Sequence, residues 1–227
     1  MTTTAPLQLL QTFRHKLLGV FSLRADALFE LTDALLLTLD PRSPVELSLS
    51  PAFRRRFSMV YDALRNGQVE PELARQLLVE AEPSEALTIA GCAVYGVDTT
   101  VDLRPDAETL PDRSRVYSTS QKKAVPGHQY SWLGRIVSQA PAWFAPRDLE
   151  RVATRDTPAG VAARQVLRLA ATLVVAGMFS VVVADSGYAK APFLAAFVGL
   201  TSLCVLVRLP CNRVLYGTPP QPVINPT

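Results

Sequence analysis

The apolar residues in the first part of the chain recur at helical spacing. The strongest repeat covers residues 23–39, and Asp40-Pro41 ends it, because proline disfavours helical backbone in the residue before it. Ser50-Pro51 predicts that another helix begins there, with serine as its cap and proline in its first turn. Asn66-Gly67 predicts the end of that helix, and the pattern over 70–81 predicts a further one.

The pattern changes after a short polar segment, EPSE, at residues 82–85. Beyond it the chain contains continuous apolar runs rich in β-branched residues, which are typical of sheet strands covered on both faces. We therefore predict an N-terminal helical domain over 1–82, a second domain over 86–217, and a proline-rich tail over 218–227 that we expect to be disordered. In the second domain, strands are predicted at 87–97, 128–138, 143–152, 179–184 and 203–209.

Two helices and one proline constrain the order of these strands. A helix is predicted to begin at Thr157-Pro158, between the third and fourth strands, and another at 191–200, between the fourth and fifth. Pro146 lies in the third strand and has no amide hydrogen to donate, so that strand should lie at an edge of the sheet. The spatial order 3-2-1-4-5 meets this requirement and gives a mixed, ribonuclease H-like sheet. The predicted fold class is α/β in this domain and α+β overall.

Two aspartates follow apolar runs in this second domain. The first strand leads into Asp98, and VVVA at 181–184 leads into Asp185. The first and fourth strands are neighbours in the predicted order, so the two carboxylates should meet at one rim of the sheet. Carboxylate oxygens are ligands of Mg²⁺, and pairs of such ions drive phosphodiester chemistry. Three nearby acids are alternative ligands or braces of the following loop: Asp102, Asp106 and Glu108.

Net charge is only +3 with a pI near 8.9, so nucleic-acid binding would depend on local basic patches. One candidate patch is Arg54, Arg55 and Arg56, for which a solvated helix face is the simpler explanation. The other is Lys122 and Lys123, in a segment at 104–127 that we interpret as a long loop-rich insertion.

Three cysteines without CxxC spacing provide neither a disulfide framework nor a zinc site, which favours a reducing cytoplasm. The N-terminus also lacks the basic-then-apolar order of a signal peptide.

The uncharged segments 169–184 and 191–207 raise the alternative of a membrane-spanning hairpin. Each is slightly shorter than the roughly 18 residues expected of a span, and Asp185 and Lys190 separate them. The same residues serve equally well as a buried helix and strands of an α/β core. We therefore expect no membrane insertion.

Several longer phrases resemble the IS701-type DDE transposases, in the order found in that family and over most of the chain. These phrases are RADALFELTDALL (24–36), ELSLSPAFRRRFSMVYDAL (46–64), VDTTVDLRPDAETLPDR (97–113), PGHQYSWL (126–133), VVVADSGY (181–188) and LVRLPCNRVLYG (206–217). The resemblance implies a ribonuclease H-like nuclease that cleaves and transfers DNA strands at transposon ends, with Mg²⁺ or Mn²⁺ as cofactor. It also implies DNA as partner, a possible homo-oligomer, and a nucleoid-associated location in the cytoplasm.

By this resemblance the first two catalytic, metal-binding aspartates of the family correspond to Asp98 and Asp185. The third acid of the family, a glutamate on a later helix, has no counterpart in this sequence, so the domain looks incomplete at its C-terminus. We therefore expect a truncated or decayed copy that cleaves DNA inefficiently on its own. The alternatives are a remnant that binds DNA without cleaving it and a small membrane protein.

Overall fold

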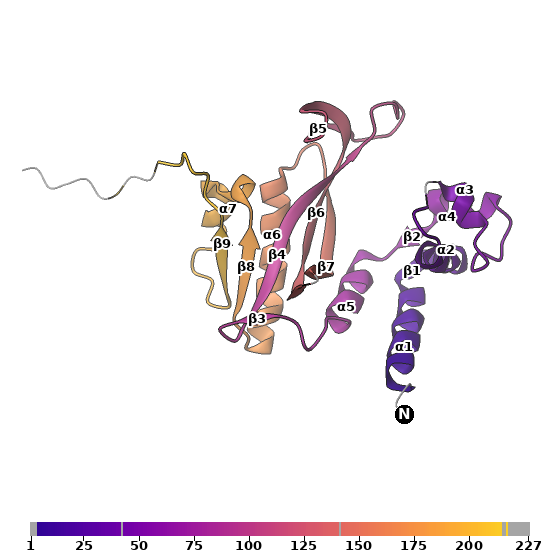
Figure 1. Ribbon diagram of the computed structural model, residues 1–227, viewed down its shortest axis with the longest axis horizontal. Coiled ribbons are helices and arrows are strands. Elements are labelled where there is room, and N and C mark those ends of the chain that lie inside the picture. The colour runs from indigo at the N-terminus through magenta and orange to yellow at the C-terminus, as the bar shows by residue number, and fades with distance from the viewer. Residues whose placement is uncertain (1–3, 42, 141, 215–216, 218–227) are drawn as a thin grey trace, which may run out of the picture. The chain divides into compact units, whose positions relative to one another are not determined.

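The computed structural model of the chain describes residues 4–41, 43–140, 142–214 and 217. The chain forms two compact units, Met1–Ser84 and Glu85–Thr227. The first is mainly helical, and the second is built on a mixed sheet (Figure 1). The predicted disordered tail at 218–227 lies outside the described residues.

The helices of the first unit hold a small apolar core. Its elements are α1 (Thr4–Val20), β1 (Phe21–Leu23), α2 (Ala25–Leu37), α3 (Pro44–Ser48), α4 (Ser58–Asn66), β2 (Gln68–Val69) and α5 (Pro71–Glu80). The buried core residues are Leu31, Ala34, Leu47, Phe53 and Val60. Arg14 of α1 also donates two hydrogen bonds to the carboxylate of Asp33 in α2, one of them at 2.7 Å.

The prediction that a helix begins at Ser50-Pro51 is wrong. The serine that caps a helix is Ser43, whose side chain accepts a hydrogen bond from a backbone amide of α3, and α4 begins only at residue 58. Between these helices Phe53 is 4% exposed, and the amide of Arg54 donates to the carboxylate of Glu30 at 3.1 Å. Tertiary contacts therefore hold this segment in a turn, although its sequence carries a helix-start signal.

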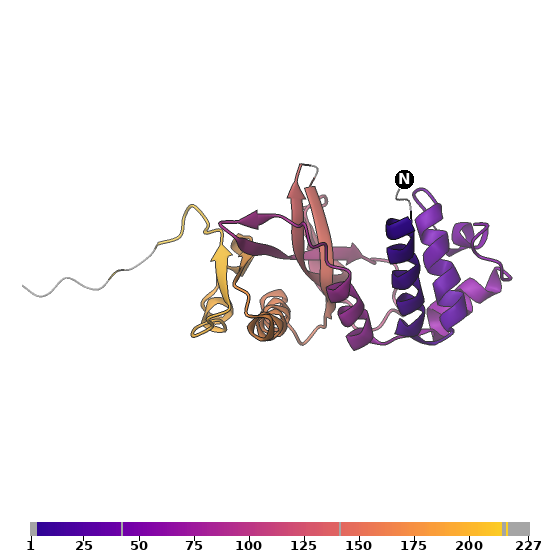
Figure 2. The ribbon, with the colours of Figure 1, turned by 90° about the horizontal axis from the view of Figure 1, so that it is seen from below.

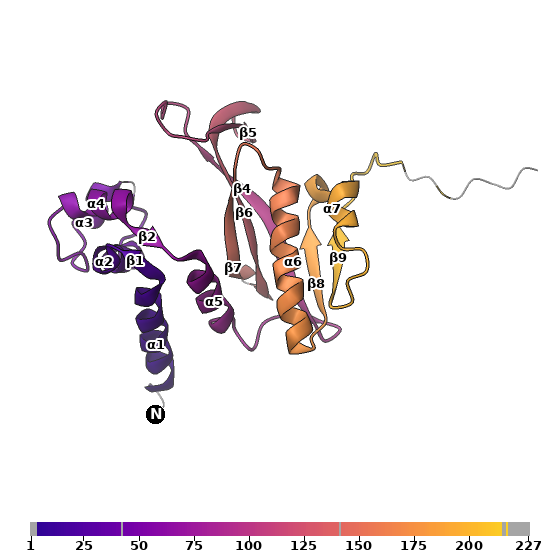
Figure 3. The same ribbon diagram turned by 180° about the vertical axis from the view of Figure 1, so that it is seen from behind.

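The second unit confirms the predicted strand order. Its strands are β3 (Thr88–Ile89), β4 (Cys92–Leu103), β5 (Ser114–Ser118), β6 (Lys123–Gln139), β7 (Ala142–Val152), β8 (Ser180–Ala184) and β9 (Leu203–Val207). The main sheet runs β7-β6-β4-β8-β9, which is the order 3-2-1-4-5 (Figures 1 and 3). β7, β6 and β4 are antiparallel, whereas β4, β8 and β9 are parallel. This is the ribonuclease H-like arrangement.

The edge position predicted for Pro146 is also confirmed. In the described sheet β7 pairs only with β6, so no second strand requires an amide from this proline. Leu133 of β6 pairs with Asp148 of β7, and the next residue of β6, Gly134, pairs with Pro146. Arg147 of β7 lies between these two pairs and forms a bulge. Pro146 therefore lies on an edge strand and beside a bulge, the two places where a sheet tolerates proline.

Two helices cover one face of the sheet. α6 (Pro158–Ala176) and α7 (Ala191–Ala195) lie on the same side, as Figure 2 shows. α6 begins at Pro158 as predicted, and Thr157 caps it, since its side chain accepts from the amide of Gly160 at 3.1 Å. The helix predicted at 191–200 is shorter than expected, because turns follow α7 and Gly199 adopts a left-handed φ of 85°. The hydrophobic core lies between these helices and the sheet, and it includes Tyr95, Val97, Leu133, Val166, Leu169, Val182 and Phe193.

Two predictions about the strands around Asp98 are wrong. The run at 87–97 is broken by a two-residue turn at Ala90 and Gly91, both with positive φ, as the type I′ hairpin requires. β4 then continues past Asp98 to Leu103, so this aspartate lies within a strand and does not end it. The segment 104–127 is not only loop, since it contains β5 and the first part of β6.

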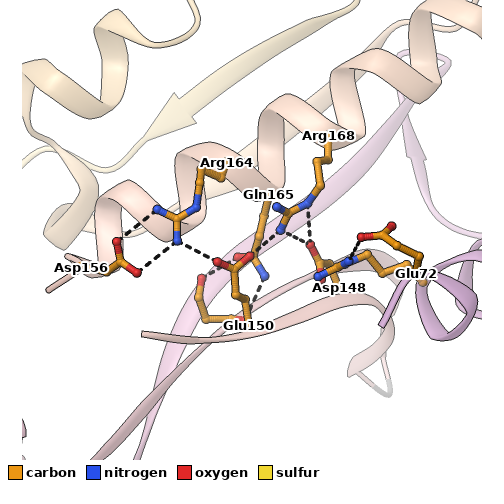
Figure 4. A network of polar contacts seen from close by, with 9 residues as sticks. Glu72, Asp148, Glu150, Asp156, Arg164, Gln165 and Arg168 are labelled. Atoms are coloured by element: carbon orange, nitrogen blue, oxygen red, sulfur yellow. Dashed lines mark hydrogen bonds and ion pairs between the residues drawn. The ribbon is translucent and has the colours of Figure 1, made fainter. Parts of the chain in front are cut away.

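An ionic network fixes α6 against the edge strand β7 (Figure 4). Arg168 binds Asp148 at 2.7 Å and Glu150 at 2.6 Å, and Arg164 binds Glu150 at 2.7 Å and Asp156 at 3.3 Å. Burial alone would raise the pKa of Glu150, but hydrogen bonds from the two arginines outweigh it and hold that pKa below its ordinary value. Asp148 is only 4% exposed, so its pairing with Arg168 is largely shielded from water.

A buried polar pair joins the same helix to β6. Ser131 donates to the side-chain oxygen of Gln165 at 2.6 Å, and the amide group of Gln165 donates to the carbonyl of Ser131 at 3.1 Å. Both residues are completely buried. None of the described helices is long and apolar enough to cross a membrane.

Candidate active site

The parallel register of β4 and β8 brings the two predicted aspartates side by side. Val97 pairs with Ala184, which is the last matched pair, and the next residues on the two strands are Asp98 and Asp185. Side chains alternate between the faces of a sheet, and Val97 and Ala184 face the core under α6. By this alternation Asp98 and Asp185 lie on the opposite face, where the pairing of β4 with β8 ends.

One oxygen of each carboxylate accepts a backbone hydrogen bond, and the other oxygen accepts none among the described residues. Oδ1 of Asp98 accepts from the amide of Thr99 at 2.7 Å, and Oδ1 of Asp185 accepts from the amide of Gly187 at 2.8 Å. Both side chains are exposed. Within the described residues, neither Oδ2 atom has a hydrogen bond or an ion-pair partner. Two negative charges thus stand next to each other without a cationic side chain to balance them.

Tyr188 ends the short turn that follows Asp185, and it was not singled out from the sequence. It is 3% exposed and packs against Phe193, with ring centroids 5.3 Å apart. Burial raises the pKa of Tyr188 to about 12, with the carboxylates of Asp98 and Asp185 acting in the same direction and the Thr99 side chain opposing them. The place of Tyr188 three residues after Asp185, on a turn, was the only signal in the sequence.

The other acids considered from the sequence do not join the pair. Asp102 lies on the same strand and face as Asp98 but is paired with Arg104 at 2.9 Å. Over the part of the chain that the structure describes, no three residues among histidine, cysteine, aspartate and glutamate are arranged to hold a metal ion. The open carboxylate oxygens of Asp98 and Asp185 are of the kind that divalent cations prefer as ligands.

The two basic patches predicted from the sequence differ in their surroundings. Arg54 and Arg55 both form ion pairs with Glu30, at 3.3 Å each, so they stabilise the first unit. Lys122 and Lys123 lie at the tip of the β5–β6 hairpin and are exposed. The third arginine of the first patch, Arg56, is exposed as well.

The strand order defines the second unit as a ribonuclease H-like domain, with Asp98 and Asp185 at the point where β8 stops pairing with β4. Residues 16–227 match the family described as DDE superfamily endonuclease, and the chain belongs to that family. No curated protein shows a significant match to the sequence.

Among solved structures, the chain is similar to a piggyBac transposase, determined by cryo-EM as a synaptic complex with hairpin DNA. The TM-score is 0.39 and the sequence identity 12%, over 63% of this chain and 27% of that one. The chain thus spans about a quarter of the length of that transposase, and the similarity is too low to carry an argument about function.

Proposed function

We propose that this chain is a transposase-type nuclease of the IS701 kind, in which Asp98 and Asp185 hold a divalent metal ion for DNA cleavage and strand transfer at transposon ends. The observation that carries the proposal is the adjacency of two exposed carboxylates without cationic partners, in a chain that belongs to the DDE superfamily endonucleases. Mg²⁺ or Mn²⁺ is the proposed ion, since both accept oxygen ligands.

When bound, such an ion supplies Lewis-acid stabilisation of phosphate oxygens. The chain contributes the fixed positions of its ligands. Because the amides of Thr99 and Gly187 each hold one oxygen of a carboxylate, the other oxygen of Asp98 and of Asp185 is oriented before metal binds.

A second candidate function is binding of DNA without efficient cleavage. It is favoured by one observation, namely that no third acid joins Asp98 and Asp185 in the described part of the chain. Two-metal catalysis requires ligands for both ions so that the attacking and leaving oxygens are held together. In either case the proposed partner is DNA, and the proposed location is the cytoplasm, in association with the nucleoid. A homo-oligomer is compatible with both candidates.

A nicking assay distinguishes these functions. Supercoiled plasmid is incubated with the purified chain and Mg²⁺ or Mn²⁺, using wild type, Asp98→Asn, Asp185→Asn and the control Asp102→Asn. Metal-dependent nicking that is lost in the first two variants and kept in the control supports the nuclease. Plasmid binding without nicking in any metal supports the second candidate. Nicking of equal rate in all four proteins contradicts a role for the two aspartates.

A further inference from the structure

The β5–β6 hairpin is a two-stranded ribbon whose outer face carries basic and aromatic side chains. Ser114–Ser118 pairs antiparallel with residues 123–127, from Ser114 opposite Gly127 to Ser118 opposite Lys123. Val116 and Val125 are buried on its inner face, at 5% and 4% exposure. The ribbon and its turn extend past the end of the sheet in Figures 1 and 3.

The outer face and the tip of this hairpin are positively charged. Arg115 and Tyr117 are exposed on the outer face, with Tyr117 at 62%, and Arg115 donates across the ribbon to the carbonyl of Ala124 at 3.1 Å. Lys122 and Lys123 are exposed at the tip, and neither has a hydrogen bond or ion pair in the described structure. The sequence contains no aspartate or glutamate from residue 113 to residue 147, so no acid within the hairpin offsets these charges.

The turn at the tip is ordered by its own polar groups. The side chain of Ser118 is 1% exposed, accepts from the amide of Gln121 at 3.2 Å, and lies 3.1 Å from the hydroxyl of Ser120. These contacts present Lys122 and Lys123 on a defined turn. Lysine, serine, threonine and glutamine side chains are the usual donors to DNA phosphates, and the major groove of B-DNA admits a two-stranded β-ribbon.

The distance from the tip to the acid pair suits duplex DNA. Asp98 is opposite Trp132 on β6, and Lys123 lies nine residues before Trp132 on the same strand. Nine residues of extended strand span about 30 Å. One turn of B-DNA measures about 34–36 Å. A duplex that lies across the sheet at Asp98 and Asp185 can therefore contact the hairpin about one helical turn away.

We propose that the β5–β6 hairpin binds duplex DNA about one helical turn from the Asp98–Asp185 pair. Lys122, Lys123 and Arg115 contact phosphates, and the ring of Tyr117 lies against the wall of the groove. This inference rests on the proposed function, because it takes DNA as the substrate of the acid pair.

The test measures binding of a fluorescent 30-base-pair duplex by anisotropy at several salt concentrations. The hairpin variant is Lys122→Gln/Lys123→Gln, and the control Arg65→Gln/Arg155→Gln removes the same charge from two exposed arginines elsewhere. Each phosphate contact contributes about 0.9 to the slope of log affinity against log salt. We therefore expect the hairpin variant to lose about 2 from that slope and about tenfold or more in affinity, with little change in the control.

A hydroxyl-radical footprint provides the second measurement. Wild type should protect two patches about ten base pairs apart, and the hairpin variant and Tyr117→Ala should lose one patch and keep the other. Circular dichroism confirms that each variant is folded.

Four outcomes would overturn the proposal. If wild type binds DNA and the hairpin variant binds with an unchanged slope, or if the control loses as much, the hairpin assignment is wrong while the proposed function stands. If wild type binds no DNA, both fall together. Tighter, equally lysine-dependent binding of an RNA duplex would show that the hairpin serves a different partner.

Discussion

Replacing one member of the acid pair should stabilise the protein when no metal is present. Asp98→Asn removes one of two adjacent negative charges that have no cationic partner among the described residues. Asparagine keeps the side-chain oxygen that accepts from the amide of Thr99, so the local geometry is preserved. The same argument applies to Asp185→Asn, whose oxygen accepts from the amide of Gly187.

The magnitude follows from the spacing of the strands. Neighbouring strands lie about 4.8 Å apart, and two unit charges at that separation repel by about 0.9 kcal/mol in water. Both side chains are exposed, and salt reduces the repulsion further, so we expect a gain of about 0.5 kcal/mol. For a chain of this size that corresponds to roughly 1–2 °C in Tm.

Thermal unfolding in EDTA, followed by circular dichroism, measures the effect. Asp102→Asn is the matched control, because Asp102 lies on the same strand but is paired with Arg104, and its loss should lower Tm slightly. Excess Mn²⁺ should then reverse the order by stabilising wild type but not Asp98→Asn. If Asp98→Asn or Asp185→Asn is less stable than wild type in EDTA, the two carboxylates do not repel each other without a cationic partner, and the prediction is wrong.

Three further predictions concern the packing beneath the site and its activity. Gln165→Leu should cost about 1–3 kcal/mol in urea unfolding, because it leaves the buried Ser131 hydroxyl unpaired, and adding Ser131→Ala should recover part of that loss. The pKa of Tyr188 is raised to about 12, so its contribution to stability is complete below pH 10 and lost as pH rises toward 12; this alkaline loss should be smaller in Tyr188→Phe. Plasmid nicking by this chain alone should be slow, because no third acid joins the proposed ligands Asp98 and Asp185 in the part of the chain that the structure describes.

The strand order could be predicted because it depends on strong local signals. Pro146 excludes its strand from the interior of any sheet, and the apolar run before Asp185 is too β-branched and too short for a helix. These two facts leave few possible strand orders for the sheet. The parallel pairing of β4 with β8, which brings Asp98 beside Asp185, follows from the remaining order.

Other features could not be predicted because competing signals or tertiary contacts decide them. Ser43 and Ser50 both precede a proline, and burial of Phe53 determines which of them caps a helix. Thr99, Val101 and Leu103 alternate with polar residues, which is the pattern of a strand. The aspartates in the same stretch favoured the interpretation that the strand ends at Asp98 and a loop follows. The role of Tyr188 depends on burial beside both carboxylates, which no spacing in the sequence reveals.

Titration with Mn²⁺ measures directly whether Asp98 and Asp185 bind a metal ion. The electron paramagnetic resonance of free Mn²⁺ gives the number of ions that the chain binds and their affinity. We predict a site in wild type and in Asp102→Asn that is lost in both Asp98→Asn and Asp185→Asn, because the two carboxylates hold the ion together. Unchanged Mn²⁺ binding in either of the last two variants would contradict it.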